Sequence, residues 1–188
     1  MTENLLKPGE RLDDLQRNGL HIIQHPQAFR FGMDAVLLAD FTRLRPRERV
    51  ADMGSGTGIL PLLLSQKQPD ARFEAFEIQP EMADMARRSV VLNGLEERIR
   101  VHAADMRAAC ELIGRESMHA VVCNPPYGER LLDVRQAQEL YRALGQVFQP
   151  RRGWSLGVIS PDPEFESLFG RKADKRRKLY NGMIQCQY

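Results

Sequence analysis

The tetrapeptide Asn124-Pro125-Pro126-Tyr127 offers an amide side chain, a proline-fixed backbone carbonyl and an aromatic ring, three groups that suit a flat ligand carrying an NH2. It follows the apolar run His119–Cys123, which predicts a buried strand. Two prolines cannot continue a strand ladder, so we expect the strand to end there. Ligands of open α/β sheets bind outside such carboxyl ends. A proline turn with a packed tyrosine is the structural alternative.

A glycine-rich segment, Asp52–Gly58, follows the predicted strand Arg49–Met53 and precedes a predicted helix. Glycine lets the backbone approach a ligand closely, and many loops of this kind bind nucleotides. A dinucleotide or ATP site should offer positive charge or a Lys-Ser/Thr pair to phosphates, whereas this segment has neither and carries Asp52. A cofactor with a ribose, an adenine and a cationic tail fits better, and S-adenosylmethionine (SAM) is such a molecule.

Two further carboxylates end the next two predicted strands. Glu77 lies at the end of the strand Arg72–Ile78, and Asp105 follows the strand Ile99–Ala103. An acidic residue about 20 positions beyond the glycine loop accepts hydrogen bonds from ribose hydroxyls, and Asp105 is placed to meet an adenine amine. Each acid also precedes a helix, so a helix N-cap is the structural alternative. Three acids at three consecutive strand ends favour a cofactor site.

The elements that position these residues alternate between strand and helix patterns from residue 49 onward. Helices are expected over residues 59–67, 80–92, 107–113, 136–148 and 163–169, and further strands over 20–24 and 154–159. Asp34 is predicted to cap a helix that reaches Phe41, and Asn181-Gly182 indicates a closing hairpin. This order predicts an α/β fold with a Rossmann-like, doubly wound, mostly parallel sheet and an antiparallel C-terminal hairpin strand.

Length and composition fit one globular domain, because 188 residues can bury a substantial core. The longest apolar runs are too short to cross a bilayer, and the N-terminus lacks the pattern of a secretory signal. The cysteines at positions 110, 123 and 186 are scattered and lack metal-ligand spacing. They indicate reduced thiols in a cytoplasmic protein without a metal.

Positive charge gathers in the C-terminal part of the chain. The net charge is +2, but residues 151–188 hold eight Lys/Arg and four Asp/Glu, a balance of +4 that leaves −2 for the remainder. The densest cluster is Arg171–Lys178, and a second lies within Arg43–Arg49. Such runs are often only solvated surfaces, whereas on an enzyme of nucleic acids they would contact phosphates.

Together the glycine loop, Glu77, Asp105 and the tetrapeptide resemble the class I SAM-dependent N-methyltransferases. Residues about 11–128 resemble the bacterial family that methylates the 6-amino group of an adenine beside the anticodon of a valine tRNA, through Ile22–Gln24 and Phe29–Ala39.

Residues about 124–188 instead resemble the catalytic domain of rRNA guanine-N2 methyltransferases, through Asn124–Arg130, Leu140-Tyr141 and Phe169–Gly182. The chain therefore looks like a hybrid of two related catalytic domains. Because the rRNA family continues further, we expect Tyr188 to lie within the last strand.

The resemblance implies two regions: an N-terminal segment, 1–48, with a helix over SAM, and a methyltransferase domain, 49–188. The flipped target base would stack on Tyr127 and bond through its amine to Asn124 and the Pro125 carbonyl, with Pro126 completing the catalytic tetrapeptide. The implied cofactor-binding residues are Phe31, Asp34, Asp52, Gly54, Gly56, Gly58, Glu77, Ile78, Asp105, Met106 and Asn124. The implied RNA-binding residues are Lys172, Lys175, Arg176, Arg177 and Lys178.

These observations predict a monomeric enzyme that transfers a methyl group from SAM to the exocyclic amine of a base in RNA, with adenine N6 in tRNA as the first choice. Guanine N2 in rRNA is the alternative within that class. Protein glutamine and DNA adenine methyltransferases share the tetrapeptide, because a glutamine amide is also a planar NH2. A non-catalytic SAM- or RNA-binding module is a further alternative, and a NAD-dependent dehydrogenase is disfavoured by the tetrapeptide.

Overall fold

The computed structural model describes residues 5–27, 31–114, 117–125, 134–148, 153–181 and 184–187. The elements in chain order are β1 (Arg11–Asp14), β2 (His21–Gln24), α1 (Met33–Phe41), β3 (Arg49–Met53), α2 (Ile59–Lys67), β4 (Arg72–Glu77), α3 (Pro80–Leu92), β5 (Ile99–Ala103), η2 (Met106–Ala108), α4 (Ala109–Ile113), β6 (Ala120–Cys123), α5 (Val134–Val147), β7 (Ser155–Val158), α6 (Phe165–Phe169), β8 (Lys178–Asn181) and β9 (Ile184–Gln187).

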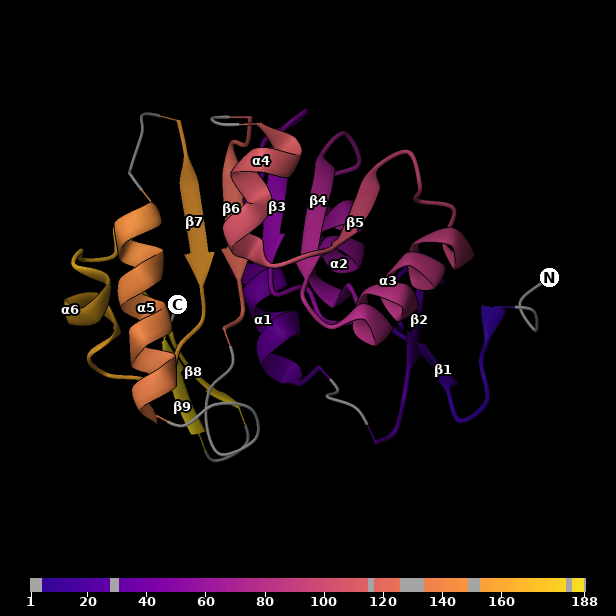
Figure 1. Ribbon diagram of the computed structural model, residues 1–188, viewed down its shortest axis with the longest axis horizontal. Helices are drawn as coiled ribbons and strands as arrows, with labels where there is room; N and C mark the ends of the chain where they lie inside the picture. The colour runs from indigo at the N-terminus through magenta and orange to yellow at the C-terminus, as the bar shows by residue number, and fades with distance from the viewer. Residues whose placement is uncertain are drawn as a thin grey trace.

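The centre of the molecule is a five-stranded parallel sheet in the order β5-β4-β3-β6-β7 (Figure 1). The chain runs outward from β3 through β4 to β5, then returns to pair β6 with the other side of β3. Strand order therefore reverses between β3 and β6, and this reversal is where doubly wound sheets bind ligands. The predicted Rossmann-like fold is confirmed.

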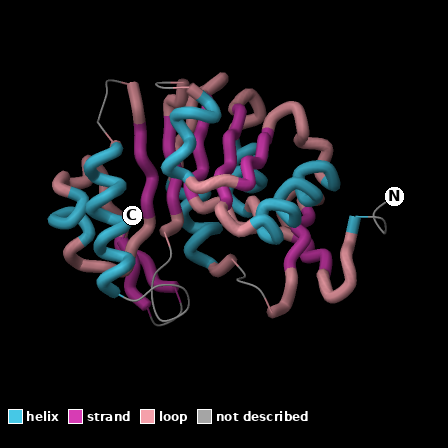
Figure 2. Tube along the Cα trace, in the orientation of Figure 1, coloured by secondary structure: helices cyan, strands magenta, loops and turns pink. Residues whose placement is uncertain are grey.

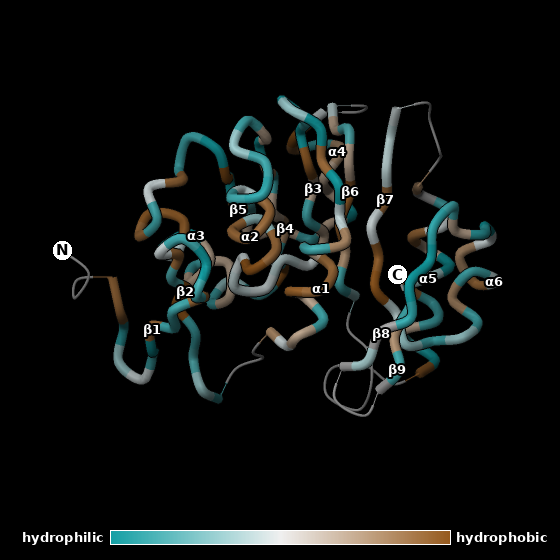
Figure 3. The backbone as a smooth tube through the Cα atoms, turned by 180° about the vertical axis from the view of Figure 1, so that it is seen from behind, coloured by the Kyte–Doolittle hydropathy of each residue, from teal (hydrophilic) through white to brown (hydrophobic). Residues whose placement is uncertain are grey.

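Helices cover both faces of the sheet, with α1 and α2 packed together on one side and α4 and α5 on the other (Figures 1 and 2). Apolar residues gather at the centre, along β4, α1 and α2 (Figure 3). Phe73 and Phe76 of β4 and Leu62 of α2 are almost completely buried. Along β4 the apolar Phe73 and Ala75 are buried, whereas the intervening Arg72 and Glu74 are more exposed, so this strand shows the alternation that the sequence predicts.

Helix α1 packs closely against β7 at a position where the strand has a glycine and therefore no side chain. Gly157 lies in β7, and a Cβ built there would meet the Thr42 hydroxyl at 3.2 Å and a Leu38 methyl at 3.7 Å. Leu38 is fully buried in the main core. The helix begins at Met33 with Gly32 as its N-cap, so the prediction that Asp34 caps it was wrong. Asp34 lies inside the first turn and is 5% exposed.

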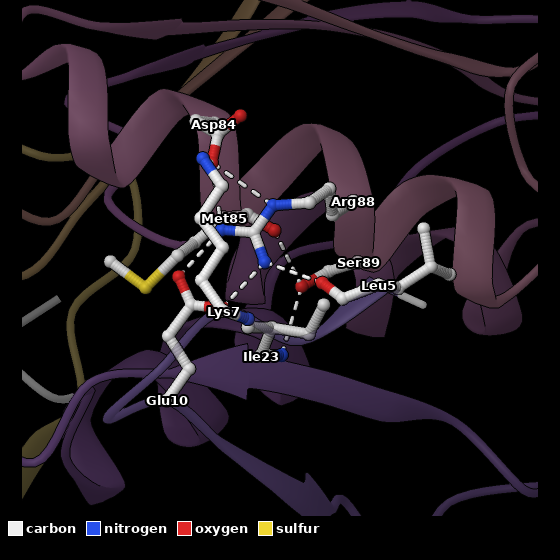
Figure 4. A network of polar contacts seen from close by, with 8 residues as sticks. All are labelled: Leu5, Lys7, Glu10, Ile23, Asp84, Met85, Arg88 and Ser89. Carbon is white, nitrogen blue, oxygen red and sulfur yellow. Dashed lines mark hydrogen bonds and ion pairs between the residues drawn. The ribbon is translucent and has the colours of Figure 1, made fainter. Parts of the chain in front are cut away.

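The N-terminal hairpin β1–β2 docks on α3, and the part-buried Arg88 ties the residues just before β1 to this helix (Figure 4). The two terminal nitrogens of Arg88 each lie 2.6 Å from an oxygen of Glu10, and one also contacts Asp84 at 2.7 Å. The Ile23 amide donates to Ser89 Oγ at 2.9 Å. The paired guanidinium lowers the pKa of Glu10. Sequence patterning missed β1 because its residues, Arg11–Asp14, are mostly charged.

The predicted C-terminal hairpin is confirmed as the antiparallel pair β8–β9, with Gly182 of its turn outside the described residues. The pair forms its own two-stranded sheet. It joins the main sheet beyond β7, where Ser160 and Gln187 exchange backbone hydrogen bonds of 2.9 and 2.8 Å.

Candidate active site at the carboxyl ends of the sheet

The three loop glycines all have positive φ values but face different neighbours. Gly54 is exposed, and a Cβ there would meet only the Met106 methyl, at 3.9 Å. Gly58, the N-cap of α2, would instead place a Cβ 3.3 Å from that of Ala86 on α3. Gly54 therefore leaves backbone open to a ligand, whereas Gly58 allows two helices to pack closely.

Asp52 lies within β3 directly before this loop and is completely buried. Neither of its carboxylate oxygens has a hydrogen-bond partner among the described residues. Burial raises the pKa of Asp52 to about 7; the neighbouring Ser55 hydroxyl opposes the shift and the charge of Glu77 adds to it. A buried carboxylate without a partner is costly, so this position suits a ligand that brings positive charge.

Glu77 ends β4 and is 6% exposed. One carboxylate oxygen accepts from the Gly56 amide and the other from the Gln79 amide, both at 2.8 Å. An ionised carboxylate has about four lone-pair sites, so each oxygen retains acceptor capacity. Ile78 follows with 62% of its surface exposed, an apolar side chain beside the loop.

Asp105 follows β5 and caps the short helix η2 that begins at Met106. One oxygen accepts from the Arg107 backbone amide at 2.8 Å, and the other from the Arg107 guanidinium at 2.5 and 2.9 Å. These hydrogen bonds lower the pKa of Asp105. Asp105 is therefore a helix N-cap, as the structural alternative expected, through its bond to the Arg107 amide. The exposed Arg107 guanidinium competes with any ligand for the same carboxylate.

Asn124 follows β6, on the other side of the strand reversal from Glu77 and Asp105. Its Nδ2 donates to Asp34 Oδ2 at 3.0 Å across 90 residues of sequence. Its Oδ1 is buried and has no hydrogen-bond partner among the described residues. Pro125 is buried beside it, whereas Pro126 and Tyr127 lie outside the described residues.

The structure thus brings the predicted cofactor residues to the carboxyl ends of neighbouring strands, and it adds a contact that the sequence did not predict. Asp34 reaches Asn124 from α1, which lies at the end toward which the arrows of β6 and β7 point (Figure 1). Phe31 packs, half-buried, against the main core just before this helix. No local pattern signals the Asp34–Asn124 pair, because its partners meet only after the whole sheet has formed.

The basic cluster lies apart from the glycine loop. Lys172, Lys175, Arg176 and Arg177 line a cavity of about 1070 Å3 together with Arg43 and residues 154–158 at β7. Arg176 also contacts Glu166 at 3.4 Å, and the exposed Lys178 begins β8. One residue of the second basic cluster, Arg43, therefore lies with residues of the first at this hollow surface.

Neither a metal centre nor a membrane helix was found in the part of the chain that the structure describes. No group of three or more His, Cys, Asp or Glu side chains there could hold a metal ion. No helix there is both long and apolar enough to span a membrane.

A parallel sheet with this strand order, a glycine loop at its reversal point and acidic strand ends defines the class I methyltransferase fold. Residues 36–188 match the family model described as UPF0020, RMKL-like, methyltransferase domain. The chain belongs to this family.

The relatives and solved structures that are similar to this chain are also named as methyltransferases. Ribosomal RNA large subunit methyltransferase K/L of Shewanella frigidimarina is 32% identical over 118 residues, which are 62% of this chain and 16% of that protein. YpsC of Bacillus subtilis is 32% identical over 61% of this chain and 29% of its own length. The crystal structure of SMU.472 with S-adenosylhomocysteine superposes with a TM-score of 0.67 at 25% identity, over 82% of this chain and 50% of that one. The chain thus spans less than a third of the length of these curated relatives.

Proposed function

We propose that this chain is the catalytic domain of an RNA N-methyltransferase that uses SAM and methylates the exocyclic amine of a base. One observation carries the proposal: the buried Oδ1 of Asn124 has no partner among the described residues and lies at the strand reversal, across from the acidic strand ends. A buried acceptor without a donor costs about 1–3 kcal/mol, so it suits a ligand that brings an N–H.

The described residues fit SAM. Asp52 offers a buried, unpartnered carboxylate to a cationic ligand, and Gly54 leaves the loop backbone accessible. Glu77 would hold the ribose, and Ile78 offers an apolar surface to the adenine ring. Asp105 would accept a hydrogen bond from the adenine amine once the Arg107 guanidinium moves away from it. The remaining residues expected near the cofactor are Phe31, Gly56, Gly58 and Met106.

When bound, SAM supplies an electrophilic methyl group on a sulfonium sulfur. Asn124 Oδ1 and the Pro125 carbonyl would accept the two N–H groups of the target amine, which draws its lone pair out of conjugation and aims it at the methyl. Tyr127 and Pro126 would stack the flipped base. Positioning of this kind supplies on the order of 7–11 kcal/mol in favourable cases. The methylated amine is acidic and loses its proton to water, so no strong general base is needed.

Ribosomal RNA is the substrate that the relatives favour, since several are named for the large ribosomal subunit. Arg43 and the basic residues 171–177 around the cavity suit its phosphates, which dominate RNA affinity. Adenine N6 in tRNA, the first choice from sequence, becomes the second candidate, supported by the similarity of residues 11–128. Guanine N2 in rRNA becomes the first.

To test the proposal, the protein is incubated with labelled SAM and, in separate reactions, unmodified large-subunit rRNA, unmodified tRNA, a DNA duplex or a glutamine-containing peptide. The methylated nucleoside or amino acid is then identified. We expect N2-methylguanosine from rRNA. N6-methyladenosine from tRNA would support the second candidate. Label in DNA or peptide alone would refute the assignment to RNA, and SAM binding without transfer to any substrate would refute catalysis. Asn124→Ala serves as the inactive control.

A further inference from the structure

The contact between Asp34 and Asn124 has a directional consequence for the amide. Asn124 Nδ2 donates to Asp34 Oδ2 at 3.0 Å, so the NH2 side of the Asn124 amide faces Asp34. A flipped amide would place two oxygen acceptors face to face at that distance. Asp34 therefore fixes which end of the Asn124 side chain points away from α1, and that end is the acceptor Oδ1.

Asp34 itself is held in place by the packing of α1. Residues 34 and 38 are four apart, so they project from the same face of the helix. Leu38 is fully buried, and it lies against the gap left by Gly157 in β7. Because Leu38 lies one turn beyond Asp34, its packing fixes the position of the helix so that Asp34 faces the end of β6. Asp34 as a whole is 5% exposed, so its bond to Asn124 is shielded from competing water.

We infer that Asp34 is a positioning residue that orients Asn124 Oδ1 toward the target amine, rather than a residue that binds SAM. This inference rests on the proposed function for its catalytic consequence. Without Asp34, the amide could rotate and present its NH2 to the incoming NH2, two donors that repel. The carboxylate also polarises the amide, which makes Oδ1 a stronger acceptor.

The first measurement does not depend on activity. In protein labelled with 15N-asparagine, the Asn124 side-chain NH2 signals are those lost in Asn124→Ala. We expect these protons to exchange with solvent at least about tenfold more slowly than those of the exposed Asn18, as a buried hydrogen bond requires. Asp34→Ala should remove this protection, whereas Asp40→Asn, at an exposed position of the same helix, should leave it unchanged. Fast exchange in the wild type, or protection that survives Asp34→Ala, would overturn the inference.

The second measurement separates orientation from cofactor binding. Asp34→Asn should lower kcat by about a hundredfold, the order expected for a misplaced catalytic group, with SAM affinity within twofold of wild type by calorimetry. A loss of SAM affinity at unchanged kcat would overturn the inference and return Asp34 to the cofactor site.

Exchanging Asp34 and Asn124 for one another controls for the case in which a single variant loses activity only because it misfolds. Asn124→Asp alone would place two carboxylates in contact and abolish transfer. The double variant Asp34→Asn/Asn124→Asp restores one donor and one fixed acceptor, and should regain at least about tenfold over the Asn124→Asp single variant. No recovery in a double variant whose unfolding midpoint matches wild type would overturn the inference. If the wild type methylates no RNA, the proposed function fails, and the exchange data still decide whether Asp34 holds Asn124.

Discussion

Replacing Asp52 with asparagine should stabilise the ligand-free protein at pH 8, with little or no net gain at pH 5. Asp52 is completely buried and its carboxylate has no partner among the described residues. Its pKa is raised from 3.8 to about 7. The folded state therefore binds more protons at this site than the unfolded state between about pH 4 and pH 7. In that window, stability falls as pH rises, because the buried group must lose its proton.

The magnitude follows from the two pKa values of Asp52. Linkage gives a destabilisation of about 2 kcal/mol at pH 5 and about 4 kcal/mol at pH 8, where the carboxylate is charged in both states. The asparagine amide is uncharged at both pH values, but it is buried and costs about 1–3 kcal/mol if unpaired. That cost is independent of pH. The informative quantity is therefore the difference between the two conditions, about 2–3 kcal/mol in favour of the variant at pH 8.

Urea unfolding of both proteins without ligand at pH 5 and pH 8 measures this difference directly. Asp70→Asn, in an exposed turn, controls for the loss of one negative charge from the chain. A stability gap between Asp52→Asn and wild type that is the same at both pH values would refute the account of Asp52 as an uncompensated buried acid. The same variant should bind SAM more weakly by calorimetry, since it no longer offers a negative charge to a cation.

Three further substitutions test separate parts of the molecule. Asp105→Ala should weaken SAM binding by about ten- to a hundredfold, the value of a lost charged hydrogen bond, and equal affinities by calorimetry would remove Asp105 from the site. Asn124→Ala should abolish methyl transfer with SAM affinity nearly intact; parallel loss of both would make Asn124 structural. Arg88→Ala should lower the free energy of unfolding by about 3 kcal/mol in urea, because the mostly buried Glu10 side chain loses its charged partner. A change below about 0.5 kcal/mol, the size of an ordinary surface substitution, would show that the hairpin docks without this ion pair.

The sequence predicts best where local pattern and tertiary burial agree. The strand Arg49–Met53, the helix Ile59–Lys67 and the strand Ile99–Ala103 have the predicted limits. Gly54 and Gly58 mark the first two, and alternating apolar residues mark the third. Prediction failed for β1, whose charged residues gain their place from pairing with β2 and from Arg88 on α3. It also failed for Asp34. The local sequence predicts a helix cap there, whereas in the structure Asp34 accepts a hydrogen bond from Asn124. Contacts between distant segments carry no local signal.

The distribution of charge explains how one fold could serve both a small cation and a polyanion. Asp34, Asp52, Glu77 and Asp105 lie near the carboxyl ends of the sheet, and such a group of carboxylates repels phosphates as strongly as it attracts a sulfonium or an ammonium. The exposed basic residues 171–177 instead line a separate cavity with Arg43. Under the proposed function, the RNA backbone is held at the basic surface and kept from the acidic one. Only an uncharged part of the RNA, a base rotated out of its stack, can then approach Asn124, so the charge pattern itself selects for base flipping.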